Sequence, residues 1–153
     1  MTLEERLRAL IEVAEFRDMP SQDRGVLAAA MREEFFRAGE TVVEAGERAD
    51  RVFVLYSGRL TVTQPGRSGI LRVLEPGALL GELAFFEDEV RTATVRAETD
   101  AFLLSLPFEN FRSFLLAHPR GALILAGRVV RALRGLENEI ADMRRGSEPV
   151  AGS

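Results

Sequence analysis

Short apolar runs separated by glycines occupy the middle of this sequence, and they limit the folds that the chain can adopt. The glycines that interrupt the runs between residues 34 and 107 are Gly39, Gly46, Gly58, Gly66, Gly69, Gly77 and Gly81. Strands that are this short and evenly spaced favour a closed or rolled antiparallel sheet. We therefore expect seven or eight strands, of which the clearest span residues 41–43, 51–57, 59–63, 69–74, 92–97 and 101–106.

Helical spacing of apolar residues flanks the predicted strands on both sides. Residues 3–31 predict two helices, the second of which opens at Pro20. Residues 108–144 predict a short helix that ends near His118 and a longer helix that starts at about Gly121. The fold class that follows is mainly β with flanking helices.

The length of 153 residues and the hydrophobic content of 46% fit one compact domain with one core. We expect this domain to span residues 1–145, with the rolled sheet over residues 34–107. Residues 146–153 favour turns and lack periodicity, so we expect a disordered tail there.

Apolar residues of the last predicted helix alternate spacings of four and three, as in the seam of a coiled coil. The seam predicts a homodimer through Ala122, Ala126, Val129, Leu133, Leu136, Ile140 and Met143. An amphipathic helix that lies on its own domain is the alternative. Leu123, Ile124, Leu125 and Val130 widen the apolar surface and are expected to contact the roll while the seam contacts the second copy.

Several kinds of chemistry are excluded by composition. Cysteine is absent, all 20 basic residues are arginine, and His118 is the only histidine. Thiolate and lysine nucleophiles, a P-loop lysine and multi-histidine metal centres are therefore out of reach. We expect no enzyme activity, no metal and no cofactor.

The charge balance and the hydropathy pattern bear on partners and location. Twenty basic against 24 acidic residues give a net charge of −4, which offers no general attraction to nucleic acid or to an anionic membrane. No apolar run reaches the ~20 residues that span a bilayer, and the N-terminus is unlike a secretory signal. We expect a cytoplasmic protein that binds neither nucleic acid nor membrane directly.

The segment from residue 81 to residue 97 carries the most specific chemistry. Gly81 ends one predicted strand and opens a single helical turn, whose backbone N–H groups favour an anion. Arg91 follows ten residues later and can place its guanidinium against the same anion. Glu82 would repel that anion unless it faces a hydrogen-bond donor, and a ribose hydroxyl is such a donor. A cyclic monophosphate suits this set better than a triphosphate, which calls for Mg²⁺ ligands and more cations.

Two stretches of this chain resemble the cyclic nucleotide-binding domain family, which includes the catabolite activator protein and the regulatory domains of cyclic nucleotide-dependent kinases and channels. Residues 42–58 are similar to the family's structural signature, in which glycines turn between strands. Residues 80–97 are similar to its phosphate-binding cassette, although Phe85 and Val90 stand where many members have an aliphatic residue and a proline. The resemblance covers about residues 14–144. It implies an eight-stranded, jelly-roll-like antiparallel β-roll flanked by helices.

The resemblance also implies roles for individual residues. Glu82 would accept a hydrogen bond from the ribose 2′-hydroxyl, and Arg91 would pair with the phosphate oxygens. The other residues implied in ligand binding are Gly81, Leu83 and Ala84 through the backbone, Thr92 and Ala93 beside the phosphate, and Val62 and Leu71 in the base pocket. Val62 and Leu71 rest on strand register, which a slip of one residue would reverse.

The base and the output of the domain depend on the final helix. Leu133, Arg134 and Leu136 are the candidates to cap the base, whereas Glu137 is expected to lie on a solvated face. Thr92 is compatible with cAMP as the ligand and with cGMP as the alternative. The main hypothesis is therefore a cyclic nucleotide sensor that signals through its last helix to a second copy or to a protein effector.

Two other functions stay open. One is a dimerisation or docking module of the same fold that binds no nucleotide. The other is the ligand-sensing part of a transcription regulator, which would need a helix-turn-helix from another chain or a longer parent protein.

Overall fold

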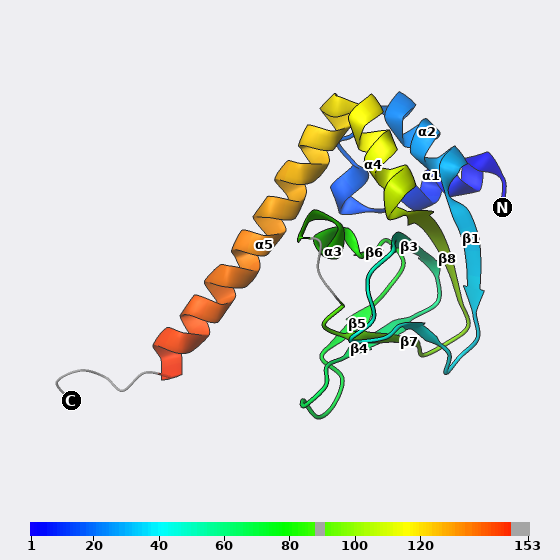
Figure 1. The fold of residues 1–153 in the computed structure, drawn as a ribbon. Coiled ribbons are helices and arrows are strands. Elements are labelled where there is room, and N and C mark those ends of the chain that lie inside the picture. The colour runs from blue at the N-terminus through cyan, green and yellow to red at the C-terminus, as the bar shows by residue number, and fades with distance from the viewer. Residues whose placement is uncertain (88–90, 148–153) are drawn as a thin grey trace.

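Three helical segments open the chain and pack together at one end of the molecule (Figure 1). They are α1 (Leu3–Ile11), the 3₁₀ turn η1 (Ala14–Phe16) and α2 (Ser21–Ala30). Helix α1 begins with a capping box, in which the Thr2 hydroxyl accepts a hydrogen bond from the N–H of Glu5 at 3.1 Å. The computed structural model describes residues 1–87 and 91–147 of the chain. The two predicted N-terminal helices are confirmed.

Eight strands within these described residues form two antiparallel four-stranded sheets, as predicted for a β-roll. In the first sheet the order is β1 (Arg32–Phe36), β8 (Ala101–Pro107), β3 (Arg51–Ser57) and β6 (Leu79–Leu80). In the second sheet the order is β2 (Thr41–Val43), β7 (Thr94–Ala97), β4 (Leu60–Thr63) and β5 (Arg72–Leu74). Strands distant in sequence therefore lie side by side, as β1 and β8 do in Figure 1.

The predicted strand limits hold for β2 and β3 and shift elsewhere. Strand β5 begins at Arg72 rather than at Gly69, because Gly66 and Gly69 both have φ of +79° and extend the turn after β4. Strand β7 begins at Thr94 rather than at Thr92. The sequence pattern did not single out β1 or the two-residue β6, whose apolar runs are too short or too mixed to stand out.

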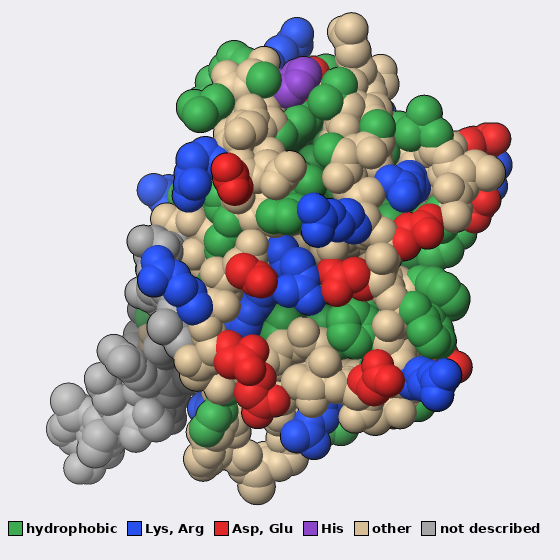
Figure 2. Space-filling model, turned by 45° about the vertical axis from the view of Figure 1, so that its right-hand side comes forward, with side chains coloured by type: hydrophobic (Ala, Val, Ile, Leu, Met, Phe, Trp, Pro, Cys, Tyr) green, Lys and Arg blue, Asp and Glu red, His purple; other side chains and the backbone are tan. Residues whose placement is uncertain are grey.

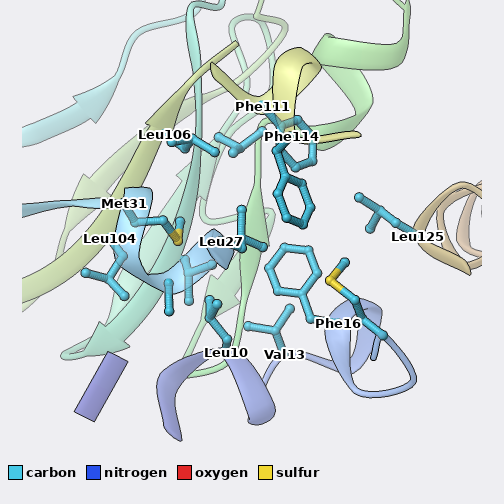
Figure 3. Close-up of a cluster of buried hydrophobic side chains, with 14 of the residues drawn as sticks. Leu10, Val13, Phe16, Leu27, Met31, Leu104, Leu106, Phe111, Phe114 and Leu125 are labelled. Carbon is cyan, nitrogen blue, oxygen red and sulfur yellow. The ribbon is translucent and has the colours of Figure 1, made fainter. Parts of the chain in front are cut away.

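The first sheet separates two clusters of buried side chains, because successive residues of a strand point to opposite faces. On β3, Val52 and Val54 face the helices, whereas Phe53 and Leu55 face the interior of the roll. The helical cluster draws on α1, η1, α2, β8, α4 (Phe108–Ala117) and α5 (Pro119–Ser147), and Figure 3 shows Leu10, Phe16, Leu104, Phe111 and Leu125 meeting there. This cluster fixes the helices against the roll.

Helices α4 and α5 follow β8 and meet at His118. Nδ1 of His118 lies 3.2 Å from Oδ1 of Asp23, so the junction is held against the start of α2. Arg128 of α5 forms an ion pair with Asp18, just beyond η1. From this end of the molecule α5 runs obliquely away from the roll (Figure 1).

The predicted division of the faces of α5 is correct for Leu125, which is buried in its own domain, and wrong for Val129, Leu123 and Val130. Val129, assigned to a dimer seam, is 6% exposed and packs with Leu125 in the helical cluster of its own chain. Leu123 and Val130, expected to contact the roll, are 76% and 48% exposed. Heptad spacing indicates which residues share a face of the helix, but it does not indicate which part of the protein, or which partner, packs against that face. The side chains of Leu133, Leu136, Ile140 and Met143 lie outside the described part of the chain.

The end of the chain differs from the sequence-based limits. Helix α5 includes Gly146 and Ser147, which were expected to open a disordered tail, and the other residues of that predicted tail lie outside the described ones. Among the described helices, none is both long and apolar enough to span a bilayer.

Candidate functional site

A tight turn at Gly81 joins β6 to the short helix α3 (Glu82–Glu87). Gly81 has φ of +89°, and a Cβ atom at this position would lie 2.7 Å from the backbone oxygen of Arg51. Only glycine fits both the conformation and the close approach. The N–H of Phe85 donates to the Gly81 oxygen at 3.0 Å, which closes the first turn of α3. The sequence thus places Glu82 at the first position of a helix that starts beside β3.

Phe85 anchors this helix in the molecule. Its ring lies 5.3 Å from that of Phe108 and 4.8 Å from that of Phe111, in edge-on geometry. Leu83 packs against the same helical cluster. An aromatic residue at position 85, where the family usually has an aliphatic one, therefore fills space against α4.

A cavity of about 340 Å³ lies between α3, the second sheet and the segment that leads into β7. The predicted ligand-binding residues outside α5 all line it, namely Val62, Leu71, Gly81, Glu82, Leu83, Ala84, Arg91, Thr92 and Ala93. The other lining residues are Val43, Arg72, Leu74, Leu79, Leu80 and Val95. The structure therefore brings together residues that are up to 31 positions apart in the predicted set, from Val62 to Ala93.

Glu82 places a carboxyl group in this cavity. Burial raises the pKa of Glu82 to about 7, and the nearby negative charge of Glu15 acts in the same direction. A hydrogen bond from its own backbone N–H and the positive charge of Arg72 oppose the rise in the pKa. At neutral pH this group is therefore poised between its ionised and protonated forms.

Arg91 is held by its backbone on the turn that follows β2. Its N–H donates to the Glu47 oxygen at 3.0 Å, and its oxygen accepts from the Gly46 N–H at 2.9 Å. Residues 88–90, which lead into Arg91, lie outside the described ones. The glycine-containing signature at residues 42–58 thus supports the arginine of the cassette.

The side chain of Arg91 is only 9% exposed, and burial lowers its pKa. Nη2 donates to the Arg51 backbone oxygen at 3.4 Å and lies 3.7 Å from Oδ1 of Asp50. The guanidinium also lies 5.8 Å from the centre of the Phe53 ring. Since a guanidinium carries five N–H donors, the contacts of Arg91 leave donors for an anion in the cavity.

Two of the predicted residues that line the cavity are apolar and come from the second sheet and the connection within it. They are Val62 on β4 and Leu71 before β5, and the N–H of Leu71 donates to the Val62 oxygen at 2.8 Å. Both residues line the cavity, but Leu71 precedes β5 and the strand partner of Val62 is Arg72. Leu71 is 47% exposed, so its side chain also reaches the rim.

Sequence reasoning missed Arg72 and the apolar residues of β2, β5, β6 and β7 as lining residues. Alternation along a strand indicates only some of them, because Leu79 and Leu80 are consecutive on β6 and both line the cavity. Arg72 was missed because the predicted strand from Gly69 gave the place opposite Val62 to Leu71, whereas in the structure β5 begins at Arg72 and Arg72 pairs with Val62.

The candidates on α5 do not join this site in the described part of the chain. Arg134 is exposed, and no lining residue of the cavity comes from α5. The side chains of Leu133, Leu136 and Glu137 lie outside the described residues.

Charge on the surface is mixed rather than uniformly basic. Figure 2 shows arginine side chains interleaved with acidic ones over one face of the molecule. The concentrated chemistry of the cavity is thus local: one buried guanidinium, one poised carboxyl group and apolar walls can hold a small anion that has an apolar or aromatic part.

Comparison with known proteins gives a consistent result. Residues 33–118 match the model of the cyclic nucleotide-binding domain. The chain is 34% identical over 106 residues to a cAMP-dependent protein kinase regulatory subunit from Yarrowia lipolytica, covering 69% of this chain and 28% of that protein. It therefore spans about a quarter of that relative's length.

Solved structures share the fold. The N-terminal domain of a transcriptional regulator from Streptomyces coelicolor is 32% identical, with a TM-score of 0.74 and coverage of 85% of this chain and 95% of that one. A regulatory subunit of a cAMP-independent protein kinase A from Trypanosoma brucei has a TM-score of 0.77 at 18% identity, over 93% of this chain and 49% of that one, a likeness of fold alone. With the β-roll and the match over residues 33–118, these findings show that the chain belongs to the cyclic nucleotide-binding domain family.

Proposed function

We propose that this domain binds a cyclic mononucleotide, cAMP or alternatively cGMP, and relays occupancy through α5. The observation that carries the proposal is the joint placement of Glu82 and Arg91 on one cavity with apolar walls. The cavity volume of about 340 Å³ lies at the lower end of the ~300–1,000 Å³ usual for ligand pockets, which suits a small nucleotide.

Charge supports a compact phosphate. Arg91 is a largely buried cation, and a cyclic monophosphate brings one negative charge to it. The phosphate adds a closer ionic partner to a desolvated guanidinium whose contact with Asp50 is 3.7 Å long, and such charge-assisted hydrogen bonds are among the stronger ones in proteins. Glu82 would take the ribose hydroxyl, which leaves the base to the apolar walls near Val62 and Leu71.

The output is proposed to pass from α3 to α5 through the helical cluster. Leu83 and Phe85 of α3 pack against the same cluster that contains Leu125 and Val129 of α5. A ligand that changes the position of α3 would change the surface on which α5 rests. Occupancy then shifts α5 between two arrangements, provided that the nucleotide binds one of them more tightly.

Calorimetric titration with cAMP and cGMP tests the proposal. The wild type should give saturable heat with at least one of them, and Arg91→Ala should abolish it or weaken it strongly. Arg96→Ala is the matched control, because Arg96 lies on β7 in the same part of the sheet but is exposed and does not line the cavity. Absence of heat with both nucleotides would remove the function.

A second candidate is a dimerisation or docking module, and the exposed Leu123 and Val130 on α5 favour it. The heptad spacing in the sequence from Leu133 onward predicts a face for a second copy or a protein effector. Sedimentation of the wild type and of Ile140→Glu should then show a dimer that the substitution dissociates. If this is the whole function, nucleotide leaves the melting temperature unchanged. A nucleotide that binds, at 100 times its Kd, would instead raise the free energy of unfolding by about 2.7 kcal/mol and the melting temperature with it.

The same domain could serve as the ligand-sensing part of a longer regulator, since the S. coelicolor structure is the N-terminal domain of a transcriptional regulator. The present chain alone should then give no shift of DNA in a gel, with or without nucleotide.

A further inference from the structure

Two acidic side chains from residues 18–23 contact helix α5 at separate points. The first, Asp23, lies in the first turn of α2, and its Oδ1 is 3.2 Å from Nδ1 of His118, between α4 and α5. A Cβ atom on Gly121, in the first turn of α5, would lie 2.8 Å from Oδ2 of the same carboxylate. The Asp23 side chain is largely buried at this contact, so the start of α5 is fixed against α2.

The second contact is of a different kind. Arg128 lies seven residues beyond Gly121, about 10 Å further along the helix, and forms an ion pair with Asp18. The side chains of Arg128 and Asp18 are 35% and 53% exposed, so water competes for both charges. Nε of Arg128 is nevertheless buried, and no described residue accepts a hydrogen bond from it. Because a buried donor without an acceptor is unfavourable, α5 is released more easily at Arg128 than at Asp23.

Apolar contacts beside these two points connect α5 to the short helix of the cavity. Leu125 and Val129 of α5 pack in the helical cluster, against which Leu83 and Phe85 of α3 also pack. A displacement of α3 therefore acts on α5 close to Arg128. None of the described residues that line the cavity belongs to α5. While the ion pair is formed, the described part of α5 thus adds nothing to the surroundings of a bound nucleotide.

We propose that the ion pair of Asp18 with Arg128 is a releasable contact that regulates the response to nucleotide, and that α5 turns about the fixed contact at Asp23. With the pair formed, α5 stays beside η1. With the pair broken, α5 is free to approach the cavity, so nucleotide binding and rupture of the pair favour each other. This inference rests on the proposed function and deepens it, because it names the contact that holds the output helix back.

This linkage fixes the direction of the effect on affinity. Arg128→Gln and Asp18→Asn each remove the ion pair, so each should tighten nucleotide binding about twofold to fivefold, the range expected for an exposed pair. Arg131→Gln is the matched control and should bind like the wild type, because Nε of Arg131 donates to the Gly127 oxygen of its own helix. Exchange of the two charges, Asp18→Arg with Arg128→Asp, forms a new pair and should return the affinity towards that of the wild type.

The position of α5 can be measured without nucleotide. Because the chain contains no cysteine, two introduced cysteines can carry spin labels at defined places. Arg96→Cys on β7 and Asn138→Cys on α5 use exposed positions. Pulsed dipolar spectroscopy, with unlabelled protein in excess so that only distances within one chain are recorded, measures the separation of the labels. We expect a second distance to be more populated in Arg128→Gln than in the wild type, and the nucleotide to increase it in both.

Calorimetry with cAMP and cGMP completes the test. Unchanged distances and unchanged affinity in Arg128→Gln and Asp18→Asn would overturn the inference while nucleotide binding stood. A fall in affinity in these two variants would also overturn it, because the ion pair would then support the arrangement that binds nucleotide. Absence of binding in the wild type would remove the proposed function, whereas the distances in the nucleotide-free protein would still show whether the ion pair holds α5.

Discussion

Two arginines approach the ring of Phe53 from two regions of the molecule, and they are partnered very differently. Arg51, on β3, lies 4.5 Å from the ring centre and makes a two-point contact with Glu34 of β1, Nε to Oε2 at 2.9 Å and Nη2 to Oε1 at 3.0 Å. Arg91 is more deeply buried, but its contact with a carboxylate is longer: Nη2 of Arg91 lies 3.7 Å from Oδ1 of Asp50.

The difference appears in the pKa values. Burial lowers the pKa of both arginines, but the hydrogen bonds and the charge of Glu34 reverse this for Arg51, whose pKa is raised. For Arg91 burial prevails, and its pKa is lowered. A buried cation without a close anionic partner binds an added anion favourably, because the anion compensates for the lost hydration. A cation that is already paired within the protein contributes to stability instead. We therefore expect Arg51 to contribute mainly to the stability of the fold and Arg91 mainly to ligand binding.

The largest expected effect is on nucleotide affinity in Arg91→Ala. Two lost charge-assisted hydrogen bonds would weaken binding by about 3 kcal/mol, or roughly 100-fold in Kd. The free energy of unfolding should change by less than about 1 kcal/mol, because the native contacts of this side chain are long. Calorimetry measures the loss of nucleotide affinity, and urea unfolding measures the change in the free energy of unfolding. A large loss of stability with unchanged affinity would break the comparison.

Arg51→Ala should do the reverse. It leaves Glu34 without its two-point partner, which should cost about 2 kcal/mol of unfolding free energy, less than the ~3–5 kcal/mol of a fully buried pair. Urea unfolding measures this loss, and Arg32→Ala, at the exposed start of β1, is the control. Stability equal to that of the control would show that the ion pair contributes nothing.

Gly81→Ala affects both regions, because the added Cβ would press on the Arg51 backbone oxygen that also accepts a hydrogen bond from Arg91. The positive φ and the contact should lower the unfolding free energy by about 1–2 kcal/mol. Displacement of α3 should weaken nucleotide binding as well. Gly39→Ala shares a positive φ of +91° but meets no atom within 4 Å, so it separates the contact from the strain of the backbone. Equal effects in both variants would exclude a role for the contact.

The smallest effect is expected in Asp50→Asn. Asp50 lies between the two arginines, with Oδ1 at 3.0 Å from Nη1 of Arg51 and 3.7 Å from Nη2 of Arg91, and it is 67% exposed. Its removal takes away an anion that competes with the phosphate for Arg91, so affinity should rise about twofold. Calorimetry in low salt checks the change. A clear fall in affinity would mean that Asp50 orients Arg91 rather than competing for it.

The rolled sheet and the cavity were accessible from the sequence because they depend on local signals. Glycines mark the turns, strand alternation places Val62 on one face, and the spacing from Gly81 to Arg91 brings the cassette together. Each of these signals comes from residues that lie within about ten positions of one another in the sequence.

Other features depend on contacts that local pattern does not encode. The pairing of Arg51 with Glu34 joins residues 17 positions apart, and the pKa of Glu82 is raised by burial under distant parts of the chain. The face of Val129 was misassigned because periodicity is the same whether a helix packs on its own domain or on a second copy. Packing between distant elements decides these cases.

A crystal structure of the domain grown with cAMP, and with cGMP in parallel, tests the central claim most directly. The account predicts a nucleotide in the cavity between α3 and the second sheet, with its phosphate on the guanidinium of Arg91 and a ribose hydroxyl on the carboxylate of Glu82. A nucleotide bound elsewhere on the molecule, or an ordered phosphate that avoids Arg91, would contradict it.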